Sequence, residues 1–252
     1  MSLKQTFLGL CTATFFAATA WQASADTTNI AVAANFTAAA KDIAAAFKED
    51  STHEAILSFG STGKLYAQIA NGAPFTVFLA ADSKRPTRLE KEGFAIEGSR
   101  FTYASGKITL FSKDASLIDQ DATILKHPDA FKRLAIANPK TAPYGAAAIE
   151  TLQKIGAYEA IKDKIVQGDN IAQTFQFVAT KNAQLGFVAL SQVINETNGS
   201  QWVVPAEYYR PIAQQAVLLT KGKDDAVARA FIAYLQSPRA QRIIQSYGYG
   251  LK

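Results

Sequence analysis

Hydrophobic and polar positions of the chain repeat one arrangement, in which a short apolar run leads through a polar turn into a segment with helical spacing. Residues 30–34 are small and apolar, which is typical of a strand buried on both faces. Residues 38–48 are rich in alanine and place Ile43 and Phe47 on one helical face. Asn35 lies between them, and since asparagine is a favoured N-cap, the pattern predicts a strand that runs directly into a helix.

The same arrangement follows twice more in the first part of the chain. Residues 54–59 are strand-like and precede the turn Gly60-Ser61-Thr62-Gly63 and a helical segment at 64–70. Residues 75–80 form another apolar run, followed by a short helical segment that ends at Gly93. Strands that alternate with helices in this way predict a parallel sheet with right-handed crossovers.

A second region, from about residue 104 onward, repeats the same alternation of strand, polar turn and helix. Its strands are expected at 134–137 and 185–190, and its helices begin after the turns 138–145 and 168–170. The chain then returns through a strand at 216–219 and ends in two helices, which we expect to fold back on the first region. The sequence therefore predicts an α/β protein of two lobes, each a mostly parallel sheet flanked by helices, joined by two crossing strands.

The lobe boundaries follow from this reading. We assign 26–103 and 210–252 to the first lobe and 104–209 to the second. Ligands of such folds bind between the lobes, at the carboxyl ends of the strands.

The first 25 residues have the composition of a secretory signal. Lys4 supplies the positive charge, residues 7–20 are apolar, and Ala23-Ser24-Ala25 provides the small residues that signal peptidase requires. The alternative, a membrane anchor, is disfavoured because the apolar run is shorter than the roughly 20 residues of a membrane span. Cys11 is the only cysteine and lies in this segment, so residues 26–252 can form neither a disulfide nor a thiolate metal site. We expect a periplasmic protein.

Composition and motifs exclude several functions. Hydrophobic residues are 48% and charged residues 19%, which predicts a packed globular core. The net charge of +5 is scattered, with no basic run of the kind that binds nucleic acid. The chain has no GxSxG, HExxH or P-loop sequence, and no base can be nominated for Ser61 as a nucleophile. We expect a protein that is not an enzyme.

Donors for an anion are plentiful by contrast. A helix start presents free backbone N–H groups and the positive end of the helix dipole. Each polar turn alone could be an ordinary capped helix that binds nothing, but four such turns, two in each lobe, are nearly free of charge. Lys64 and Asp169 are the nearest formal charges. Because such a pocket offers mainly donors, it favours a fully ionised anion over a protonated one.

The chain resembles the periplasmic molybdate-binding proteins of ABC importers over essentially its whole mature length. The similarity rests on the order of AANFTAAAKDIAAAF, SFGSTGKLYAQIANGAP, FLAADSK, NPKTAPYGAAAIETLQKIG, DNIAQTFQFVATKNAQLGFVAL and SPRAQRIIQSYGY. The resemblance implies a type II periplasmic-binding-protein fold that holds molybdate or tungstate through N–H and hydroxyl donors. It implies no cofactor, no direct protein ligand to the metal, a membrane permease as partner and a monomeric protein.

The resemblance also implies the residues of the ligand site, which are Ala34, Asn35, Ser61, Thr62, Tyr144 and Ile171. Thr62 is the hydroxyl expected to contact the anion, and Ile171 is expected to use its backbone N–H. One branch of the family has a tyrosine donor where this chain has Ala189, so Asn35 and Tyr144 follow the other branch. Two alternatives stay open: another oxyanion such as sulfate or phosphate, and an enzyme on the same two-lobed fold, as some deaminases are.

We predict that the exported protein begins at Asp26, because the signal peptidase site ends at Ala25. Mass spectrometry of protein purified from the periplasm measures this directly. Retention of Met1 in a membrane-associated protein would contradict the prediction.

Overall fold

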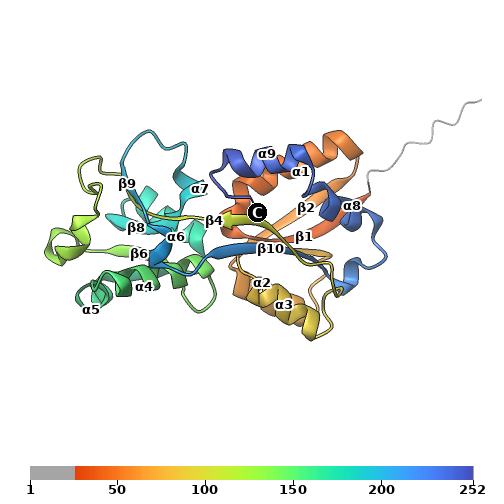
Figure 1. Cartoon of the computed structure of the whole chain (residues 1–252), viewed down its shortest axis with the longest axis horizontal. Coiled ribbons are helices and arrows are strands. Elements are labelled where there is room, and N and C mark those ends of the chain that lie inside the picture. The colour runs from red at the N-terminus through yellow and green to blue at the C-terminus, as the bar shows by residue number, and fades with distance from the viewer. Residues whose placement is uncertain (1–25, 252) are drawn as a thin grey trace, which may run out of the picture.

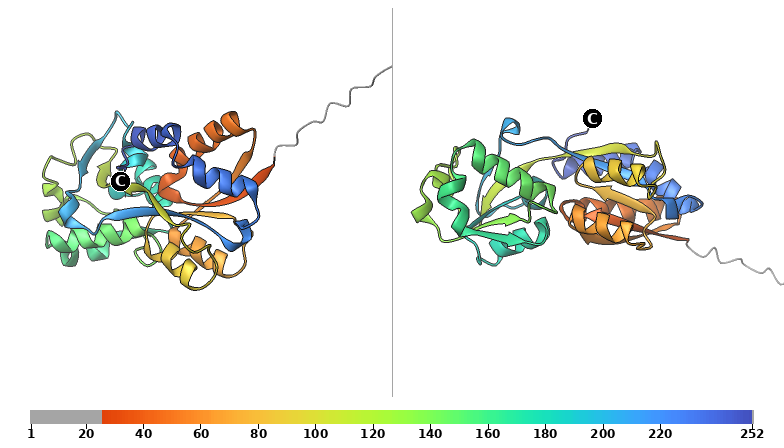
Figure 2. Two further views of the ribbon diagram at one scale, coloured as in Figure 1. Left: turned by 45° about the vertical axis from the view of Figure 1, so that its right-hand side comes forward. Right: turned by 90° about the horizontal axis from the view of Figure 1, so that it is seen from below.

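The computed structural model describes residues 26–251, so the predicted signal segment lies outside the described residues. Two lobes lie side by side, and each is a five-stranded sheet between layers of helices (Figures 1 and 2). The two-lobed α/β fold predicted from the sequence is confirmed. No helix within residues 26–251 is both long enough and apolar enough to cross a membrane.

The first lobe is built from both ends of the described chain. Its strands are β1 (Thr27–Ala33), β2 (Glu54–Gly60), β3 (Val77–Ala80), β4 (Phe101–Gly106) and β10 (Ile212–Leu218). Its helices are α1 (Thr37–Ser51), α2 (Thr62–Ala70), α3 (Lys84–Lys91), α8 (Ala226–Tyr234) and α9 (Pro238–Ser246).

The second lobe comes from the middle of the chain. Its strands are β5 (Ile108–Ser112), β6 (Leu134–Ala137), β7 (Ile165–Gly168), β8 (Leu185–Ala189) and β9 (Ser200–Val203). Its helices are α4 (Pro143–Lys154), α5 (Tyr158–Ile161), α6 (Ile171–Ala179) and α7 (Leu190–Val193). Short 3₁₀ turns complete the connections of both lobes.

The two sheets share one topology. Their strand orders are β2-β1-β3-β10-β4 and β7-β6-β8-β5-β9. In each sheet the first three strands pair in parallel and the last two join antiparallel, so the pairing is mixed. The parallel strands, β2-β1-β3 and β7-β6-β8, are those that alternate with helices along the chain. Their carboxyl ends face the other lobe, which is where the topology places a ligand.

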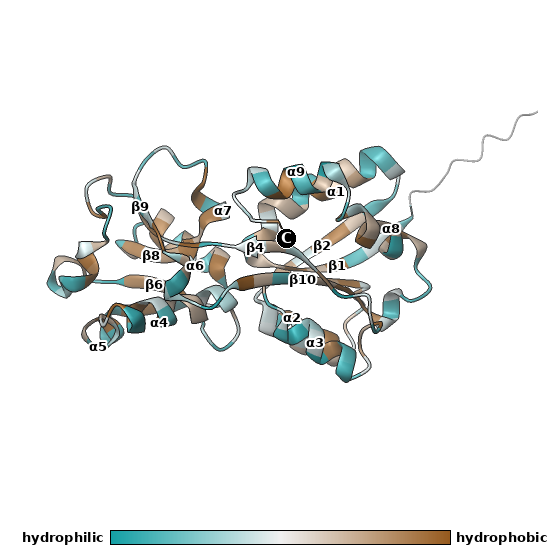
Figure 3. Ribbon diagram, viewed as in Figure 1, coloured by the Kyte–Doolittle hydropathy of each residue, from teal (hydrophilic) through white to brown (hydrophobic). Residues whose placement is uncertain are grey.

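Apolar side chains of the strands and helices form the cores on both faces of each sheet. Helices α1, α8 and α9 cover one face of the first sheet, and α2 and α3 cover the other (Figure 1). The two last helices therefore fold back on the first lobe, as the sequence predicted. Hydrophobic segments concentrate on the strands, whereas α3 and α4 mix polar and apolar residues as surface helices do (Figure 3).

The chain changes sheet at two places. β4 pairs with β10 through Gly106, and β5 begins in the second sheet at Ile108. The return connection passes from β9 to Ile212, where β10 starts. The whole of β4 thus lies in the first sheet. Its last residue, Gly106, is three residues beyond residue 103, at which the sequence analysis ended the first segment of the first lobe.

We predict that Gly145→Ala lowers the free energy of unfolding by about 1–3 kcal/mol, the usual cost of forcing an atom into a packed core. A Cβ at this position would lie 2.0 Å from the carbonyl oxygen of Ala137, where α4 packs on β6. Urea denaturation measures the change. Gly250→Ala is the matched control, because its Cβ would make an ordinary contact of 3.5 Å. Equal stability of the two variants would contradict the prediction.

Candidate functional site

The six residues predicted to bind a ligand line one cavity between the lobes. The cavity is bounded by Ala34, Asn35, Ser61 and Thr62 of the first lobe and by Tyr144 and Ile171 of the second. Its volume is about 10 Å³, which is about the space that one water molecule needs and far less than the few hundred Å³ of an organic ligand site. The structure therefore brings together residues that lie up to 137 positions apart in the sequence.

None of the residues that line this cavity carries a formal charge. The nearest charges predicted from the sequence, Lys64 and Asp169, pair with each other across the cleft at 2.8 Å. Within residues 26–251 there is no cluster of three or more His, Cys, Asp or Glu side chains that could hold a metal ion. A ligand in this cavity would therefore meet the dipoles of N–H and O–H groups and no charged side chain.

Two helices of the second lobe, α4 and α6, begin at the cavity. In the first turn of each helix, a single backbone N–H group has no hydrogen-bond partner among the described residues. In α4, Pro143 has no N–H, and the N–H groups of Gly145 and Ala146 donate to the carbonyl of Ala142. That leaves Tyr144. In α6, the side chain of Asn170 accepts from Ala172 and Gln173, as predicted for an N-cap.

Ile171 is therefore the remaining first-turn donor of α6. The N–H groups of Tyr144 and Ile171 both belong to helix starts that line the cavity, where the dipole is positive. The sequence analysis named both residues, and the capping geometry supplies the reason.

Two hydroxyl groups enter the cavity from the first lobe, and they differ in their partners. Ser61 is the N-cap residue of α2, is almost fully buried, and its Oγ has no hydrogen-bond partner. The Oγ1 of Thr62 accepts from the backbone N–H of Ala81 at 3.1 Å. Of these two hydroxyls, only that of Ser61 has no partner within residues 26–251. The bond from Ala81 uses Thr62 Oγ1 as an acceptor, so the O–H of Thr62 can still donate, and its predicted contact with the anion stays a prediction.

The N-cap role predicted for Asn35 is wrong. β1 ends at Ala33, a 3₁₀ turn covers Ala34–Phe36, and α1 begins at Thr37 without a side-chain cap. The amide nitrogen of Asn35 instead donates to Gln214 Oε1 at 2.6 Å. The buried partner on β10 therefore takes the amide that the sequence analysis assigned to a cap. Near the start of α1, the hydroxyl of Thr37 donates to the carbonyl of Ala34.

Tyr144 is fully buried at the start of α4, and its hydroxyl lies against the connection between the lobes. A Cβ on Gly106 would come within 2.1 Å of this hydroxyl oxygen, so glycine is required there. Asn35 Nδ2 lies 3.5 Å from the same oxygen. Burial raises the pKa of Tyr144 well above its ordinary value, so the phenol keeps its proton and can donate a hydrogen bond.

Several residues of the cavity and its wall were missed by the sequence analysis. Ala81 follows strand β3 just as Ala34 follows β1, so the strand–turn pattern could have indicated it. Gln214 is fully buried and holds the amide of Asn35. Its only signal in the sequence was a polar residue in the apolar run of β10.

The lobes touch across the cleft around this cavity. The N–H of Gly63 donates to the carbonyl of Thr141 at 2.8 Å, and a Cβ on Gly63 would meet the Cα of Thr141 at 3.0 Å. Ala33, Ala34 and Ala81 of the first lobe pack into the main core cluster of the second. The structure is thus the closed arrangement of the lobes.

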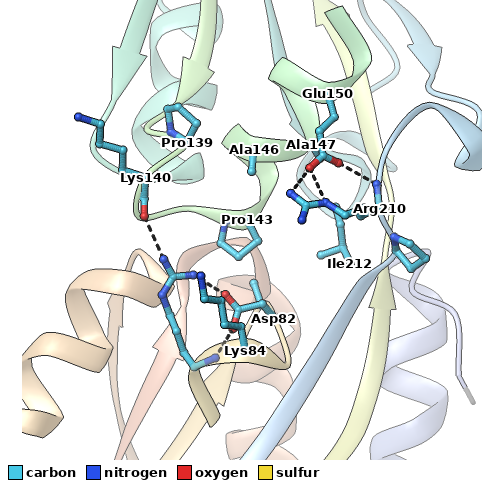
Figure 4. Close-up of a pocket in the computed structure, with 13 residues that line it drawn as sticks. Asp82, Lys84, Pro139, Lys140, Pro143, Ala146, Ala147, Glu150, Arg210 and Ile212 are labelled. Atoms are coloured by element: carbon cyan, nitrogen blue, oxygen red, sulfur yellow. Dashed lines mark hydrogen bonds and ion pairs between the residues drawn. The ribbon is translucent and has the colours of Figure 1, made fainter. Parts of the chain in front are cut away.

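A larger cavity of about 340 Å³ opens next to the small one and shares Ala81 and Pro143 with it (Figure 4). Both of its guanidinium groups already have partners: Arg85 pairs with Asp82 and donates to the carbonyl of Lys140, and Arg210 pairs with Glu150. Lys84 and Lys140 line this cavity as well. The small cavity is the better candidate for an anion site, because α2, α4 and α6 all begin at it and it contains the buried hydroxyl of Ser61, which has no partner in the described part of the chain.

Comparisons with known proteins agree with this geometry. Residues 28–250 match the family model described as bacterial extracellular solute-binding protein. The chain is 57% identical to the molybdate-binding protein ModA of Azotobacter vinelandii, over 91% of this chain and 92% of that protein. It is 51% identical to ModA of Rhodobacter capsulatus, over 87% and 86%.

A solved structure shows the same likeness in three dimensions. The periplasmic molybdate-binding protein of Azotobacter vinelandii superposes with a TM-score of 0.86 at 38% identity. The superposition covers 89% of this chain and 99% of that one.

We predict that Ser61→Ala leaves the free energy of unfolding within about 0.5 kcal/mol of the wild type, because the lost hydroxyl has no partner. Thr62→Val should lower it by about 1–3 kcal/mol, since the buried N–H of Ala81 loses its acceptor. Urea denaturation without added oxyanion tests both. A larger loss for Ser61→Ala than for Thr62→Val would refute the assigned hydrogen bonds.

Proposed function

The chain belongs to the bacterial extracellular solute-binding proteins, and from this premise we propose that it captures molybdate or tungstate between its lobes and delivers the anion to an ABC permease. Two relatives to which it is 57% and 51% identical are named as molybdate-binding proteins. The proposed ligand residues are Ala34, Asn35, Ser61, Thr62, Tyr144 and Ile171.

The observation that carries the proposal is a buried hydroxyl without a partner in an uncharged cavity at which helix starts from both lobes meet. Burying a hydroxyl that makes no hydrogen bond costs free energy, so an unpaired Ser61 Oγ points to a ligand that accepts. An oxyanion accepts from every direction, and the helix dipoles favour its charge.

The energetics suffice for tight binding. A charge-assisted hydrogen bond contributes ~1.5–3 kcal/mol, and a helix start adds ~0.3–1 kcal/mol. Half a dozen such bonds give on the order of 10–18 kcal/mol before the costs of desolvation and lost freedom. A net ~8–12 kcal/mol corresponds to a dissociation constant between micromolar and nanomolar.

Selection against protonated anions follows from the acceptors around the cavity. The carbonyl of Asn35 accepts from two hydroxyl groups, and the carbonyl of Ala142 accepts from two N–H groups. Gln214 Oε1 is taken by Asn35. A protonated oxyanion must donate a hydrogen bond, so it would leave its proton unpaired against these groups.

The remaining parts of the proposal concern where and how the protein acts. Its family places it outside the cytoplasm. We propose that residues 1–25 direct export and are removed, that the protein acts as a monomer without a cofactor, and that it catalyses no reaction. No protein atom would coordinate the metal, since the oxygens of the anion face the N–H and O–H donors.

We predict that isothermal titration of residues 26–252 gives a dissociation constant at or below about one micromolar for molybdate and tungstate. Sulfate and phosphate should bind more weakly. Ligand should also raise the melting temperature by mass action. The absence of heat and of a melting shift with saturating molybdate would overturn the proposal.

A pair of serine variants locates the site in the same titration. Ser61→Ala should weaken molybdate binding by about 1–3 kcal/mol, because it removes a donor to a charged group. Ser116→Ala is the matched control, since Ser116 is exposed on the second lobe and bonds to Asp114. Equal affinities of these two variants would exclude Ser61 from the site.

A further inference from the structure

A cluster of hydrogen-bonded side chains behind the small cavity joins three separate parts of the chain. Asn35 comes from the turn after β1, Ser191 from α7 of the second lobe, and Tyr249 from the segment that follows α9. Neither Ser191 nor Tyr249 lines the cavity. Whatever they do for a ligand, they do through Asn35.

The cluster holds Asn35 at both of its polar ends. The Tyr249 hydroxyl donates to the backbone carbonyl of Asn35 at 2.7 Å and lies 2.8 Å from Ser191 Oγ. Ser191 Oγ donates to the same carbonyl at 3.1 Å. The amide nitrogen of Asn35 donates to Gln214 Oε1 at 2.6 Å and to the Tyr249 hydroxyl at 3.1 Å.

Tyr249 is held firmly to the first lobe. Backbone N–H groups and carbonyls of Ser105 and Gly250 exchange two hydrogen bonds of 2.8 and 2.9 Å, which adds the C-terminal segment to the edge of β4. The ring of Tyr249 packs edge-on against Phe36, with ring centroids 5.2 Å apart. Burial raises the pKa of Tyr249 to about 12, so its hydroxyl remains a donor at neutral pH.

Ser191 belongs to the other lobe. It lies on α7, directly after β8 of the second sheet. Gly248 comes so close to this helix that a Cβ there would lie 2.7 Å from Ile194 Cδ1, and its φ of +78° favours glycine as well. The bonds from Ser191 to Tyr249 and Asn35 therefore join the second lobe to the first.

We infer that Tyr249 and Ser191, together with Gln214, are positioning residues for the anion site: they fix the Asn35 turn against the cavity and tie it to closure of the lobes. The inference rests on the proposed function, since it concerns the same site. An anion that closes the lobes gains these bonds in addition to its own contacts. Without them, the closed state is less populated and the apparent affinity falls in proportion.

The test is Tyr249→Phe, which keeps the ring on Phe36 and removes only the hydroxyl. Titration with molybdate should show a dissociation constant about tenfold higher than that of the wild type, the effect of one or two neutral hydrogen bonds. Stopped-flow measurements should place most of the change in the dissociation rate, because the bonds form after the anion has entered. Urea denaturation without molybdate separates a loss of fold stability from this effect.

Tyr247→Phe is the matched control, two residues earlier in the same segment. Its hydroxyl donates to Asp42 Oδ2 at 2.6 Å, a contact within the first lobe. This variant should bind molybdate like the wild type. Ser191→Ala breaks the cluster from the other lobe and should raise the dissociation constant about threefold. In a double variant with Tyr249→Phe, Ser191→Ala should raise the dissociation constant less than it does alone, because the two hydroxyls share one set of bonds.

Each outcome has one meaning. Tyr249→Phe with wild-type affinity and dissociation rate overturns the inference and leaves the proposed function standing. If Tyr249→Phe fails to fold, an unchanged affinity of Ser191→Ala overturns it. A fully additive double variant also overturns it. If the wild type and Tyr247→Phe both fail to bind molybdate, the proposed function fails and the inference fails with it.

Discussion

Helix starts from two lobes meet at one small cavity that has no charged side chain on its wall, and the rest of the structure depends on this meeting. A buried anion without a counter-ion must find fixed dipoles in place of water. Backbone N–H groups at helix starts are such dipoles, and only a fold that aims several of them at one point can supply enough. Each lobe alone provides only part of the set: α2 belongs to the first lobe, and α4 and α6 to the second.

The requirement for two lobes explains how capture and closure are linked. Polar contacts across the cleft outside the cavity are few. They are a backbone hydrogen bond between Gly63 and Thr141, a bond from Arg85 to the carbonyl of Lys140, the bonds of Ser191 to Asn35 and Tyr249, and an exposed ion pair between Lys64 and Asp169. Exposed ion pairs contribute little to stability. An anion that accepts hydrogen bonds from both lobes can therefore decide the balance between open and closed states.

The glycines at the interface show how closely the backbones must approach for this to work. Gly106 makes room for the hydroxyl of Tyr144, and Gly63 lets α2 touch the Thr141 loop. Both lie at points where a single added carbon would push the lobes or the site apart. Small residues at the cleft are thus part of the binding geometry, even though they donate nothing from a side chain.

Strand–turn–helix repeats and the fold of two lobes could be predicted from the sequence, because they depend largely on contacts between near neighbours. The six cavity residues were predicted only through the resemblance to a family, since they lie far apart in the sequence. Apolar spacing marks the strands and helices, and a cap such as Asn170 bonds to N–H groups two and three residues away. Likewise, the resemblance to a family rested on the order of such local segments. Where a turn follows a buried parallel strand, its place at the carboxyl edge of the sheet follows as well.

The partners of individual side chains were decided only by the tertiary structure. Asparagine is a residue type favoured at helix N-caps. The amide of Asn35 nevertheless bonds to Gln214, 179 residues away, and its carbonyl bonds to Tyr249, 214 residues away. Ser61 and Thr62 are adjacent hydroxyls, and the backbone of Ala81 engages one and leaves the other free. Such choices depend on how whole elements pack against one another, because a hydrogen bond requires its two atoms within about 3 Å, and local sequence does not set distances between remote segments.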